Sequence, residues 1–507
     1  MTLSEQELER RKSREEIINL GFNPYPTELF KTNITSKRIK DKFNLNKKDK
    51  KLQNVSIAGR LMSRRIMGSA SFAEILDSTG RIQLYIRRDD ICREEDKTLY
   101  NVLFKKRLDL GDIIGISGFV FETKLGEITI HINSLKLLSK SLKPIPVVKE
   151  ITNEKGIKTV FDAFSDKETK YRRRYVDLII NDSSKEVFVK RSRIINKIRS
   201  IFESKNYLEV ETPILQPIYG GASARPFTTY HNSLDIPLYL RIANELYLKR
   251  LIIGGFEGVY EFGKDFRNEG MSRFHNPEFT QCELYVAYKD YLWMMEFVEE
   301  IFEQLSLDLY DDTKIQCGKY KINFKKPWKR YTMFEVIKKF IGIDFSDMNE
   351  KQLIKLCKKL NLKTDKSMGK GKLIDQIFSE KCEKNLIQPT FITDYPIEMS
   401  PLAKKHRSKK GLVERFELIC NGKEVCNAFS ELNDPIDQKK RFEYQIELGK
   451  KGDTEAMVLD EDFLQALEYG MPPTAGIGIG IDRLTMIMTN SDSIQDVILF
   501  PQMKPKK

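Results

Sequence analysis

Residues 259–288, VYEFGKDFRNEGMSRFHNPEFTQCELYVAY, decide the fold. Apolar runs on either side of a polar centre predict two strands joined by a loop, in which Gly270 and Asn276-Pro277 supply the turn geometry. Arg267 stands at the end of the first strand, where its planar fork of donors can hold a carboxylate and a phosphate together. An ordinary surface hairpin is the alternative interpretation, but the full composition of the loop argues against it.

A second distinctive stretch lies near the end of the chain, GMPPTAGIGIGIDRL at residues 470–484. Gly476, Gly478 and Gly480 alternate with isoleucines, so one face of the predicted strand has no side chains and a flat ligand could approach its backbone. Arg483 then begins a helix, where it is suitably placed for a triphosphate or for the face of a base. Close packing of a helix on the strand would produce the same glycine pattern.

Two carboxylates flank a probable turn in residues 414–434. Glu417 and Glu424 stand on either side of Asn421-Gly422, a favoured hairpin dipeptide, so adjacent strands could present both carboxylates on one face. Because Mg²⁺ takes a few carboxylates and completes its shell with phosphate and water, such a pair predicts a magnesium site. Two solvated strand carboxylates are the alternative.

Periodicity and turn residues divide the 507-residue chain, and its length favours more than one domain. Residues 1–50 predict a solvated, charged helical extension, and residues 51–142 predict about five antiparallel strands, typical of an OB-fold barrel. Proline and mixed charge in residues 143–165 favour a linker without regular structure. Residues 166–507 alternate strands with helices, and about 325–388 form an inserted helical subdomain. The predicted fold class is therefore α+β and multidomain.

Composition favours a cytoplasmic protein and is compatible with an RNA partner. The formal excess of 13 positive charges fits a polyanion, but it fits solubility or biased codon usage equally well. The seven cysteines form no CxxC pair, which argues against a disulfide framework and against a zinc site. Without an apolar leader-like segment or a run near ~18 apolar residues, we expect neither export nor membrane anchoring.

Taken together, these segments resemble class II lysyl-tRNA synthetases almost end to end. The resemblance is carried by GRLMSRRIMG, EVETPILQPIYGGASARPF, FRNEG, HNPEFT, AFSELNDP and PPTAGIGIGIDRL. It implies an antiparallel catalytic sheet flanked by helices and preceded by an OB-fold anticodon-binding domain, in a homodimer. The implied activity is ATP-dependent conversion of L-lysine to lysyl-adenylate with release of pyrophosphate, followed by transfer of lysine to the 3′ end of tRNA(Lys).

The resemblance also implies roles for single residues. Arg267 and Arg483 would be catalytic, the first between the α-phosphate and the amino-acid carboxylate and the second against adenine and near the γ-phosphate. Further ATP contacts would come from Glu269, His275, Asn276, Phe279 and Glu424. The Mg²⁺ ligands would be Glu417 and Glu424. The lysine pocket would consist of Gly221, Glu245, Arg267, Glu283, Tyr285, Asn427 and Glu431. In the barrel, the anticodon would be read by Phe72, Gln83 and Glu127, although Phe72 could instead belong to the barrel core.

Other classes of protein share parts of this pattern. An aspartyl- or asparaginyl-tRNA synthetase shares the architecture, but an acidic amino acid would need basic groups in place of Glu283 and Glu431. A paralogue that lysylates a protein such as elongation factor P would lack the barrel. An RNA-binding or regulatory protein with an inactive site is disfavoured by the intact residues Arg267, Glu417, Glu424 and Arg483.

Several positions depart from the family pattern. Phe274 precedes His275, where many bacterial relatives have arginine, and Arg273 lies one position earlier with no assigned role. Cys426 and Ala428 replace glycines that commonly flank the pocket asparagine. These replacements predict an altered backbone approach or altered cysteine reactivity beside the pocket.

Overall fold

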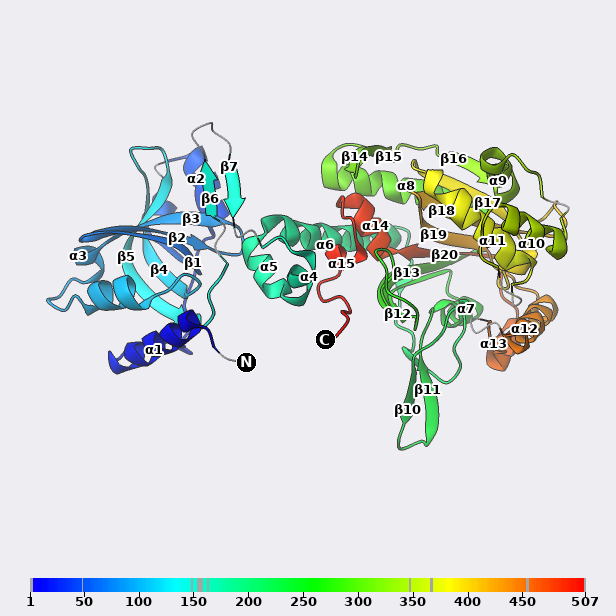
Figure 1. Ribbon diagram of the computed structural model, residues 1–507, viewed down its shortest axis with the longest axis horizontal. Helices are drawn as coiled ribbons and strands as arrows, with labels where there is room; N and C mark the ends of the chain where they lie inside the picture. Colours follow the sequence, from blue (N-terminus) through cyan, green and yellow to red (C-terminus); the bar gives the residue numbers. More distant parts are fainter. Residues whose placement is uncertain are drawn as a thin grey trace. The chain divides into compact units, whose positions relative to one another are not determined.

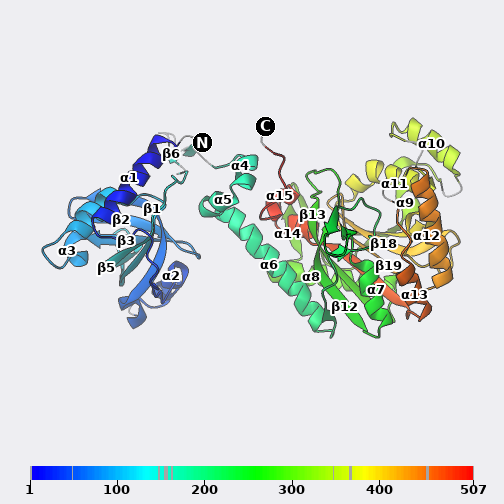
Figure 2. The same ribbon diagram turned by 90° about the horizontal axis from the view of Figure 1, so that it is seen from below.

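The computed structural model describes residues 3–47, 49–146, 149–152, 158–161, 164–345, 348–364, 368–452 and 456–505. The chain divides into two compact units, Met1–Phe164 and Ser165–Lys507 (Figures 1 and 2). Much of the predicted linker, residues 147–148, 153–157 and 162–163, lies outside the described residues.

Five strands of the first unit close into a barrel, which confirms the predicted OB fold. Their order around the barrel is β1-β2-β3-β5-β4, with β3 and β5 parallel. Residues along β2 and β3 alternate between the buried interior and the outer surface, as expected for strands of a small barrel. The strands are β1 (Val55–Met67), β2 (Ala70–Leu76), β3 (Arg81–Arg87), β4 (Ile113–Glu122) and β5 (Ile128–Ser139).

The N-terminal helices α1 (Glu5–Asn19) and α2 (Ser36–Leu45) belong to the same unit. Ile17, Ile39 and Phe43 are buried in the hydrophobic core of the barrel unit. The expectation of a solvated extension is therefore wrong for these helix faces, because burial of their apolar side chains favours packing against the barrel.

A short hairpin lies within the segment predicted to be an irregular linker. The strands β6 (Lys149–Thr152) and β7 (Lys158–Phe161) pair in antiparallel fashion. The expectation that this segment has no regular structure is wrong for these eight residues, since backbone pairing needs no apolar pattern in the sequence.

The second unit is built on an eight-stranded sheet with the order β16-β17-β18-β19-β20-β13-β12-β8. All neighbours are antiparallel except β16 with β17 and β12 with β8, so the predicted antiparallel catalytic sheet is confirmed. Its strands are β8 (Leu208–Glu209), β12 (Gly258–Phe266), β13 (Glu278–Ala287), β16 (Lys329–Thr332), β17 (Thr390–Pro396), β18 (Leu412–Cys420), β19 (Lys423–Ser430) and β20 (Thr474–Gly480).

One face of this sheet is covered by helices that share a single apolar core with it. These helices are α6 (Asp182–Glu203), α8 (Tyr291–Tyr310) and α14 (Ile481–Met488). A second core, beside the β12–β13 end, includes side chains of α7 (Glu245–Ile253), α12 (Pro435–Lys450) and α13 (Glu461–Glu468). Val259, Tyr285 and Ala287 of the sheet pack in this second core.

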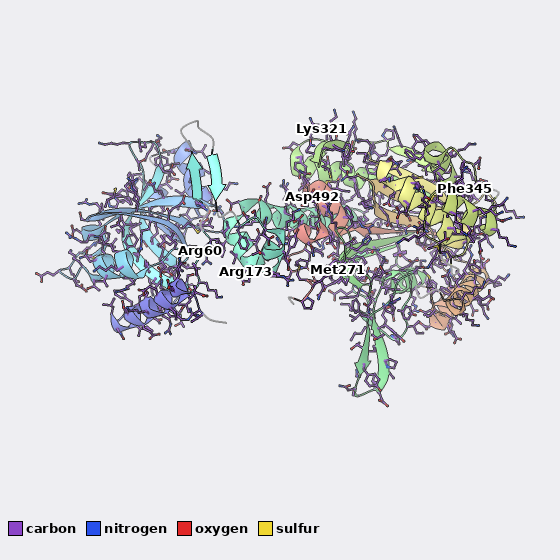
Figure 3. The ribbon with its side chains drawn as sticks, viewed as in Figure 1. Arg60, Arg173, Met271, Lys321, Phe345 and Asp492 are labelled. Atoms are coloured by element: carbon purple, nitrogen blue, oxygen red, sulfur yellow. The ribbon has the colours of Figure 1, made fainter. Side chains whose placement is uncertain are left out.

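The helices of the inserted subdomain, with Phe345, share a core with β17 and β18 of the main sheet (Figure 3). Its helices are α9 (Met333–Ile341), α10 (Glu350–Lys359) and α11 (Lys370–Lys381). The predicted insertion began at about residue 325, whereas residues 329–332 form β16 and extend the main sheet. A four-residue edge strand leaves too short a pattern for sequence reasoning to separate it from the helix that follows.

Short elements complete the two units. They are α3 (Arg88–Ile91), α4 (Lys167–Arg172), α5 (Arg174–Ile180), α15 (Ile494–Val497), β9 (Leu215–Gln216), β10 (Thr228–His231), β11 (Ile236–Leu240), β14 (Lys314–Cys317), β15 (Tyr320–Asn323), and the irregular helices Lys50–Gln53, Leu99–Arg107, Glu383–Asn385 and Ile397–Met399. Among the described ranges, none of the helices combines the length and the apolar character that a membrane span requires.

Candidate active site

Strand periodicity separates apolar from polar side chains across the central strands of the sheet. On β13, Cys282 and Leu284 pack in the helix-covered core. The intervening Glu283 and the following Tyr285 therefore face the opposite side, as residues two apart on a strand do. The paired β20 contributes Gly476 opposite Tyr285, and the same face carries the functional side chains described below.

Gly476 is required by the side chains packed over it. A Cβ atom there would lie 2.0 Å from Oε1 of Glu431 and 2.5 Å from Cε1 of Tyr285, and one at Gly478 would lie 2.4 Å from Nε2 of Gln281. The side-chain-free surface predicted for β20 is thus filled by neighbouring pocket groups at these two positions. Gly480 differs, because a Cβ there would meet only ordinary contacts.

Three carboxylates are buried together on this face, those of Glu245, Glu283 and Glu431. Tyr285 Oη donates to Oε2 of Glu283 at 3.0 Å, and Gln281 Nε2 donates to Oε1 at 2.9 Å. Burial raises the pKa of all three carboxyls, most strongly at Glu283 and Glu431. Such a concentration of desolvated acids favours a cationic ligand.

A lysine that sequence reasoning missed lies between two of these carboxylates. Lys249 is fully buried; its Nζ donates to Oε1 of Glu245 at 2.5 Å and forms an ion pair with Glu431. The i,i+4 spacing of Glu245 and Lys249 was the available signal, since residues four apart on a helix are neighbours. The contact with Glu431 joins α7 to the residue after β19 and is set by tertiary packing.

Arg267 supplies a positive charge to the site and opposes the rise in the pKa of the buried Asp265. Its backbone N–H donates to the carbonyl of Pro277 at 2.9 Å, which anchors the residue just after β12. Its guanidinium lies 5.0 Å from the centroid of the Phe279 ring. Within the described part of the chain, the buried Nε of Arg267 has no hydrogen-bond acceptor. A buried donor without a protein partner is suited to an anionic ligand.

Arg483, at the start of α14, contacts Glu424 on β19 and His275 in the loop before β13. Its Nη1 donates to the backbone oxygen of Glu424 at 2.9 Å and to Oε2 of Glu424 at 3.1 Å, and its Nη2 lies 3.1 Å from Nε2 of His275. Desolvation and the nearby Arg483 lower the pKa of His275. A neutral ring that accepts at Nε2 and donates from Nδ1 to Ser272 Oγ, 2.8 Å away, satisfies both contacts.

Glu417 and Glu424 lie on neighbouring strands as predicted. The turn between them places Asn421 at φ 51° and Gly422 at φ 69°, the left-handed pair that a tight hairpin requires. Burial and the charge of Glu424 raise the pKa of Glu417 to about 8, although Arg415 opposes this rise. Among the described residues no group of three or more Cys, His, Asp or Glu could hold a metal ion. Two carboxylates on neighbouring strands nevertheless suit Mg²⁺, whose remaining ligands would be phosphate oxygens and water.

Arg415 is a second site residue that sequence reasoning missed. Its Nη2 donates to Glu417 at 2.6 Å and its Nε to Oδ1 of Asn427 at 3.0 Å, while Nη1 binds the Met399 carbonyl at 2.8 Å. The guanidinium also lies 4.5 Å from the ring of Tyr395. Its position two residues before Glu417 on β18 indicated a shared face, but the contact with Asn427 depends on strand register.

The remaining predicted residues are distributed around these groups. Gly221 has φ +85° and packs against Glu245, whose Cβ would be 3.2 Å from a Cβ at the glycine. Asn276 is buried and donates to the carbonyl of Glu278 at 2.5 Å. Glu269 is exposed in the loop after β12, with its backbone N–H bound to the Arg267 carbonyl.

The two departures beside Asn427 do not alter the open face of the site. Cys426 and Ala428 both point into the helix-covered core, whereas Asn427 points to the other side of β19. Burial raises the pKa of the Cys426 thiol, which makes it a poor nucleophile. The expected changes in cysteine reactivity and in backbone approach on the ligand face are therefore not supported by the geometry.

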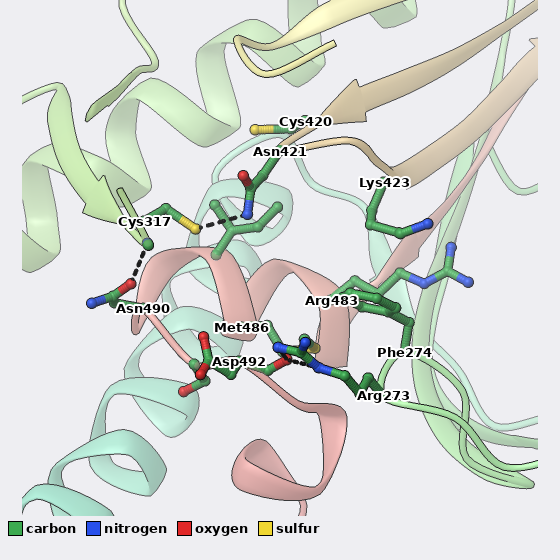
Figure 4. Close-up of a pocket in the computed structure, with 13 residues that line it drawn as sticks. Arg273, Phe274, Cys317, Cys420, Asn421, Lys423, Arg483, Met486, Asn490 and Asp492 are labelled. Atoms are coloured by element: carbon green, nitrogen blue, oxygen red, sulfur yellow. Dashed lines mark hydrogen bonds between the residues drawn. The ribbon is translucent and has the colours of Figure 1, made fainter. Parts of the chain in front are cut away.

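Arg273 and Phe274 border a cavity of about 110 Å³ next to Arg483 (Figure 4). Arg273 Nη2 donates to the carbonyl of Asp492 at 3.1 Å, and the ammonium of Lys423 lies 4.9 Å from the Phe274 ring. The cavity is lined by Arg273, Phe274, Cys317, Gly318, Cys420, Asn421, Lys423, Arg483, Met486, Ile487, Asn490, Ser491 and Asp492. Arg483 thus lies both in the site and on the wall of this cavity.

In the barrel unit, Phe72 is half-buried on the outer surface and does not belong to the core, so the core interpretation is wrong. Its ring centroid is 5.1 Å from that of Tyr85, and Gln83 accepts a hydrogen bond from Thr129 at 2.8 Å. Glu127 is exposed in the β4–β5 turn. Sequence reasoning missed the rings that extend this aromatic surface, Tyr85, Phe119, Phe121 and His131.

An OB-fold barrel followed by an antiparallel sheet with facing acidic and basic groups is the architecture of a class II tRNA synthetase. Residues 166–504 match the family described as tRNA synthetases class II (D, K and N), and residues 55–138 match the OB-fold nucleic acid binding domain. These matches confirm the class that the motifs predicted.

Individual relatives narrow the class further. A curated lysine--tRNA ligase of Porphyromonas gingivalis is 59% identical to the chain, and the match covers 100% of the chain and 87% of the relative. A curated lysine--tRNA ligase of Azobacteroides pseudotrichonymphae is 57% identical, and the match covers 100% of the chain and 99% of the relative. That of Christiangramia forsetii is 57% identical over the whole chain and 87% of the relative. The chain therefore belongs to the lysine--tRNA ligase family, as the sequence resemblance predicted.

Proposed function

We propose that the chain converts L-lysine and ATP to lysyl-adenylate and pyrophosphate, and then transfers lysine to the 3′ end of tRNA(Lys). Family membership supports the reaction. The observation that carries the choice of substrate is the group of three buried carboxylates on the face that also bears Arg267. A cationic amino acid compensates such a pocket, whereas aspartate or asparagine would leave the acids unpaired.

Each part of the amino acid has a matching group. Glu283 and Tyr285, already hydrogen-bonded to each other, would hold the ε-ammonium together with Glu431. Glu245 and Gly221 would contact the α-ammonium. Asn427, held by Arg415, would contact the carboxylate, as would Arg267.

Adenylate formation needs positioning and charge neutralisation more than a protein nucleophile, because the carboxylate of lysine itself attacks the α-phosphorus. Arg267 would hold the attacking carboxylate and the α-phosphate, a role supported by its unpartnered buried Nε. Arg483 would lie on adenine and near the γ-phosphate, with neutral His275 beside the departing pyrophosphate. Contacts to the adenosine would come from Glu269, Asn276 and Phe279.

The residues present fit a magnesium ion, which would supply charge compensation for the triphosphate when bound. Glu417 and Glu424 would hold it together with phosphate oxygens. Arg415 fixes one oxygen of Glu417, and Arg483 binds one oxygen of Glu424, so both carboxylates are oriented before the nucleotide arrives.

For tRNA, we assign Phe72, Gln83 and Glu127 to the anticodon, since single-stranded bases are read by stacking and by hydrogen bonds to their edges. The neighbouring Tyr85 widens the stacking surface. Attack of the terminal ribose hydroxyl on the adenylate needs no dedicated protein base. A homodimer formed partly through residues 187–213 and a cytoplasmic location complete the proposal, both on the resemblance to the family.

Lysine-specific activation is tested by ATP–pyrophosphate exchange with each of the twenty amino acids. We expect exchange with L-lysine alone, followed by lysylation of tRNA(Lys). Exchange with aspartate alone, or with no amino acid, would overturn the proposal.

A further inference from the structure

Lys249 has no role in the functional assignments above, yet it lies inside the pocket assigned to lysine. Its side chain is fully buried, with an exposed fraction of 0%. Its ammonium contacts Glu245 at 2.5 Å, forms an ion pair with Glu431, and lies 5.3 Å and 5.9 Å from the rings of Phe429 and Phe463. A buried charge held in this way is costly to retain unless it compensates other charges.

Lys249 contacts one carboxylate oxygen of each of its two partners. It binds Oε1 of Glu245 and Oε2 of Glu431. The other oxygen of Glu431, Oε1, lies over Gly476 beside Tyr285. Among the described residues neither oxygen of Glu431 has a hydrogen-bond partner, and the ion pair with Lys249 is made by Oε2. One oxygen of Glu431 is thus held by the protein, and the second is left for a ligand.

The charges of the pocket do not balance without a substrate. Burial raises the pKa of all three carboxyls, but when a cationic ligand holds them ionised, Lys249 compensates one of the three negative charges and two are left for the ligand. Burial by itself would lower the pKa of Lys249, but Glu245 and Glu431 hold it above its ordinary value, so the ammonium stays charged. The neighbouring charges balance among themselves. Arg415 pairs with Glu417. The two further buried acids, Glu261 and Asp265, are matched by two guanidinium groups, because Arg241 pairs with both acids and the charge of Arg267 also opposes the rise in the pKa of Asp265.

We infer that Lys249 is the internal counter-cation of the amino-acid pocket. It compensates one of the three carboxylates and leaves two negative charges, which matches an amino acid with both an α-ammonium and a side-chain ammonium. Lys249 is a positioning and specificity-determining residue rather than a catalytic one, since it acts through Glu245 and Glu431. This inference rests on the proposed function and explains how that pocket selects a doubly cationic substrate.

The first test is Lys249→Met in the full chain, which removes the charge and keeps the length. Three carboxylates would then face two ammonium groups, so one of them must take up a proton and is lost as a ligand. In ATP–pyrophosphate exchange we expect the KM for L-lysine to rise at least about tenfold, with the KM for ATP unchanged within about twofold. Lys190→Met is the matched control, because Lys190 forms a partly exposed i,i+4 ion pair with Glu186 on α6.

The second test repeats the substitution in a Glu431→Gln background. There Glu245, Glu283 and Lys249 leave only one negative charge, and removal of Lys249 restores two. We therefore expect Lys249→Met to lower the KM for L-lysine in this background, a reversal of its effect on the unmodified chain. A purely structural tether between α7 and the sheet predicts a loss in both backgrounds.

The inference is overturned if Lys249→Met leaves the KM for lysine unchanged, if the KM values for lysine and ATP rise together, or if the effect has the same sign in both backgrounds. Failure of the proposed function looks different, because the unmodified chain would then show no lysine-dependent exchange.

Discussion

In the proposed function the catalytic sheet and the barrel would each bind a ligand on a β-surface, but their surfaces differ in chemistry. The sheet places buried charges on its open face, including Glu283 at 3% exposure and Glu431 at 1%. The barrel presents half-buried, mostly neutral groups such as Phe72 and Tyr85. Buried charges are costly until a ligand compensates them, whereas aromatic surfaces are tolerated in water. We therefore expect large effects from single changes on the sheet and small, graded effects on the barrel.

The largest effect is expected for Arg267→Ala. The variant loses the donor that would hold both the carboxylate and the α-phosphate, so lysine-dependent exchange should fall by about a thousandfold. Arg199→Ala is the control, because Arg199 also lies over a phenylalanine ring, 4.7 Å from Phe262, but pairs with Glu209. Near-normal exchange by a folded Arg267→Ala protein, with folding checked by circular dichroism, would refute the role.

Next is Glu283→Gln, which keeps the shape of the pocket and removes one buried charge. A buried ion pair that loses one partner costs about 3 kcal/mol, so the KM for L-lysine should rise about a hundredfold while the KM for ATP stays constant. Glu278→Gln on the same strand is the control, since Glu278 is exposed and pairs with Lys264 at 3.5 Å. A KM for lysine within twofold of the unmodified value would show that Glu283 does not face the substrate.

Gly476→Ala tests whether the close packing on the sheet serves the pocket. Its Cβ would lie 2.0 Å from Glu431 and 2.5 Å from Tyr285, so both side chains must shift, and kcat/KM for lysine should fall about thirtyfold. Gly480→Ala on the same strand should have little effect, because the nearest atom would be 3.5 Å away. Equal losses in the two variants would point to a general defect of the strand.

The smallest effect is expected in the barrel. Phe72→Ala should lower kcat/KM for tRNA(Lys) only about fivefold to tenfold, as loss of one stacking partner costs about 1 kcal/mol and Tyr85 remains. Lysine-dependent exchange without tRNA should be unchanged. A collapse of exchange in this variant would break the contrast between the two units.

Strand and hairpin patterns were readable because they depend on neighbours in the chain. The alternation of Glu283 and Tyr285 predicted a shared face, and the structure joins them by a 3.0 Å hydrogen bond. The Asn421-Gly422 dipeptide predicted the hairpin that brings Glu417 towards Glu424. In the structure, Asn421 and Gly422 both adopt positive φ. The linker hairpin and the edge strand β16 were missed, because such short pairings leave no lasting periodicity.

The sequence by itself determined the fold class, the family and the face on which each strand residue lies, since all of these follow from local periodicity and from motifs with fixed spacing. Only the tertiary structure decided which charges compensate one another. Lys249 meets Glu431, and Arg415 meets Asn427, through the packing of α7 and the register of β18 with β19. Ion pairing falls off over a few ångströms, so partners distant in the chain can be identified only after packing has set their separation.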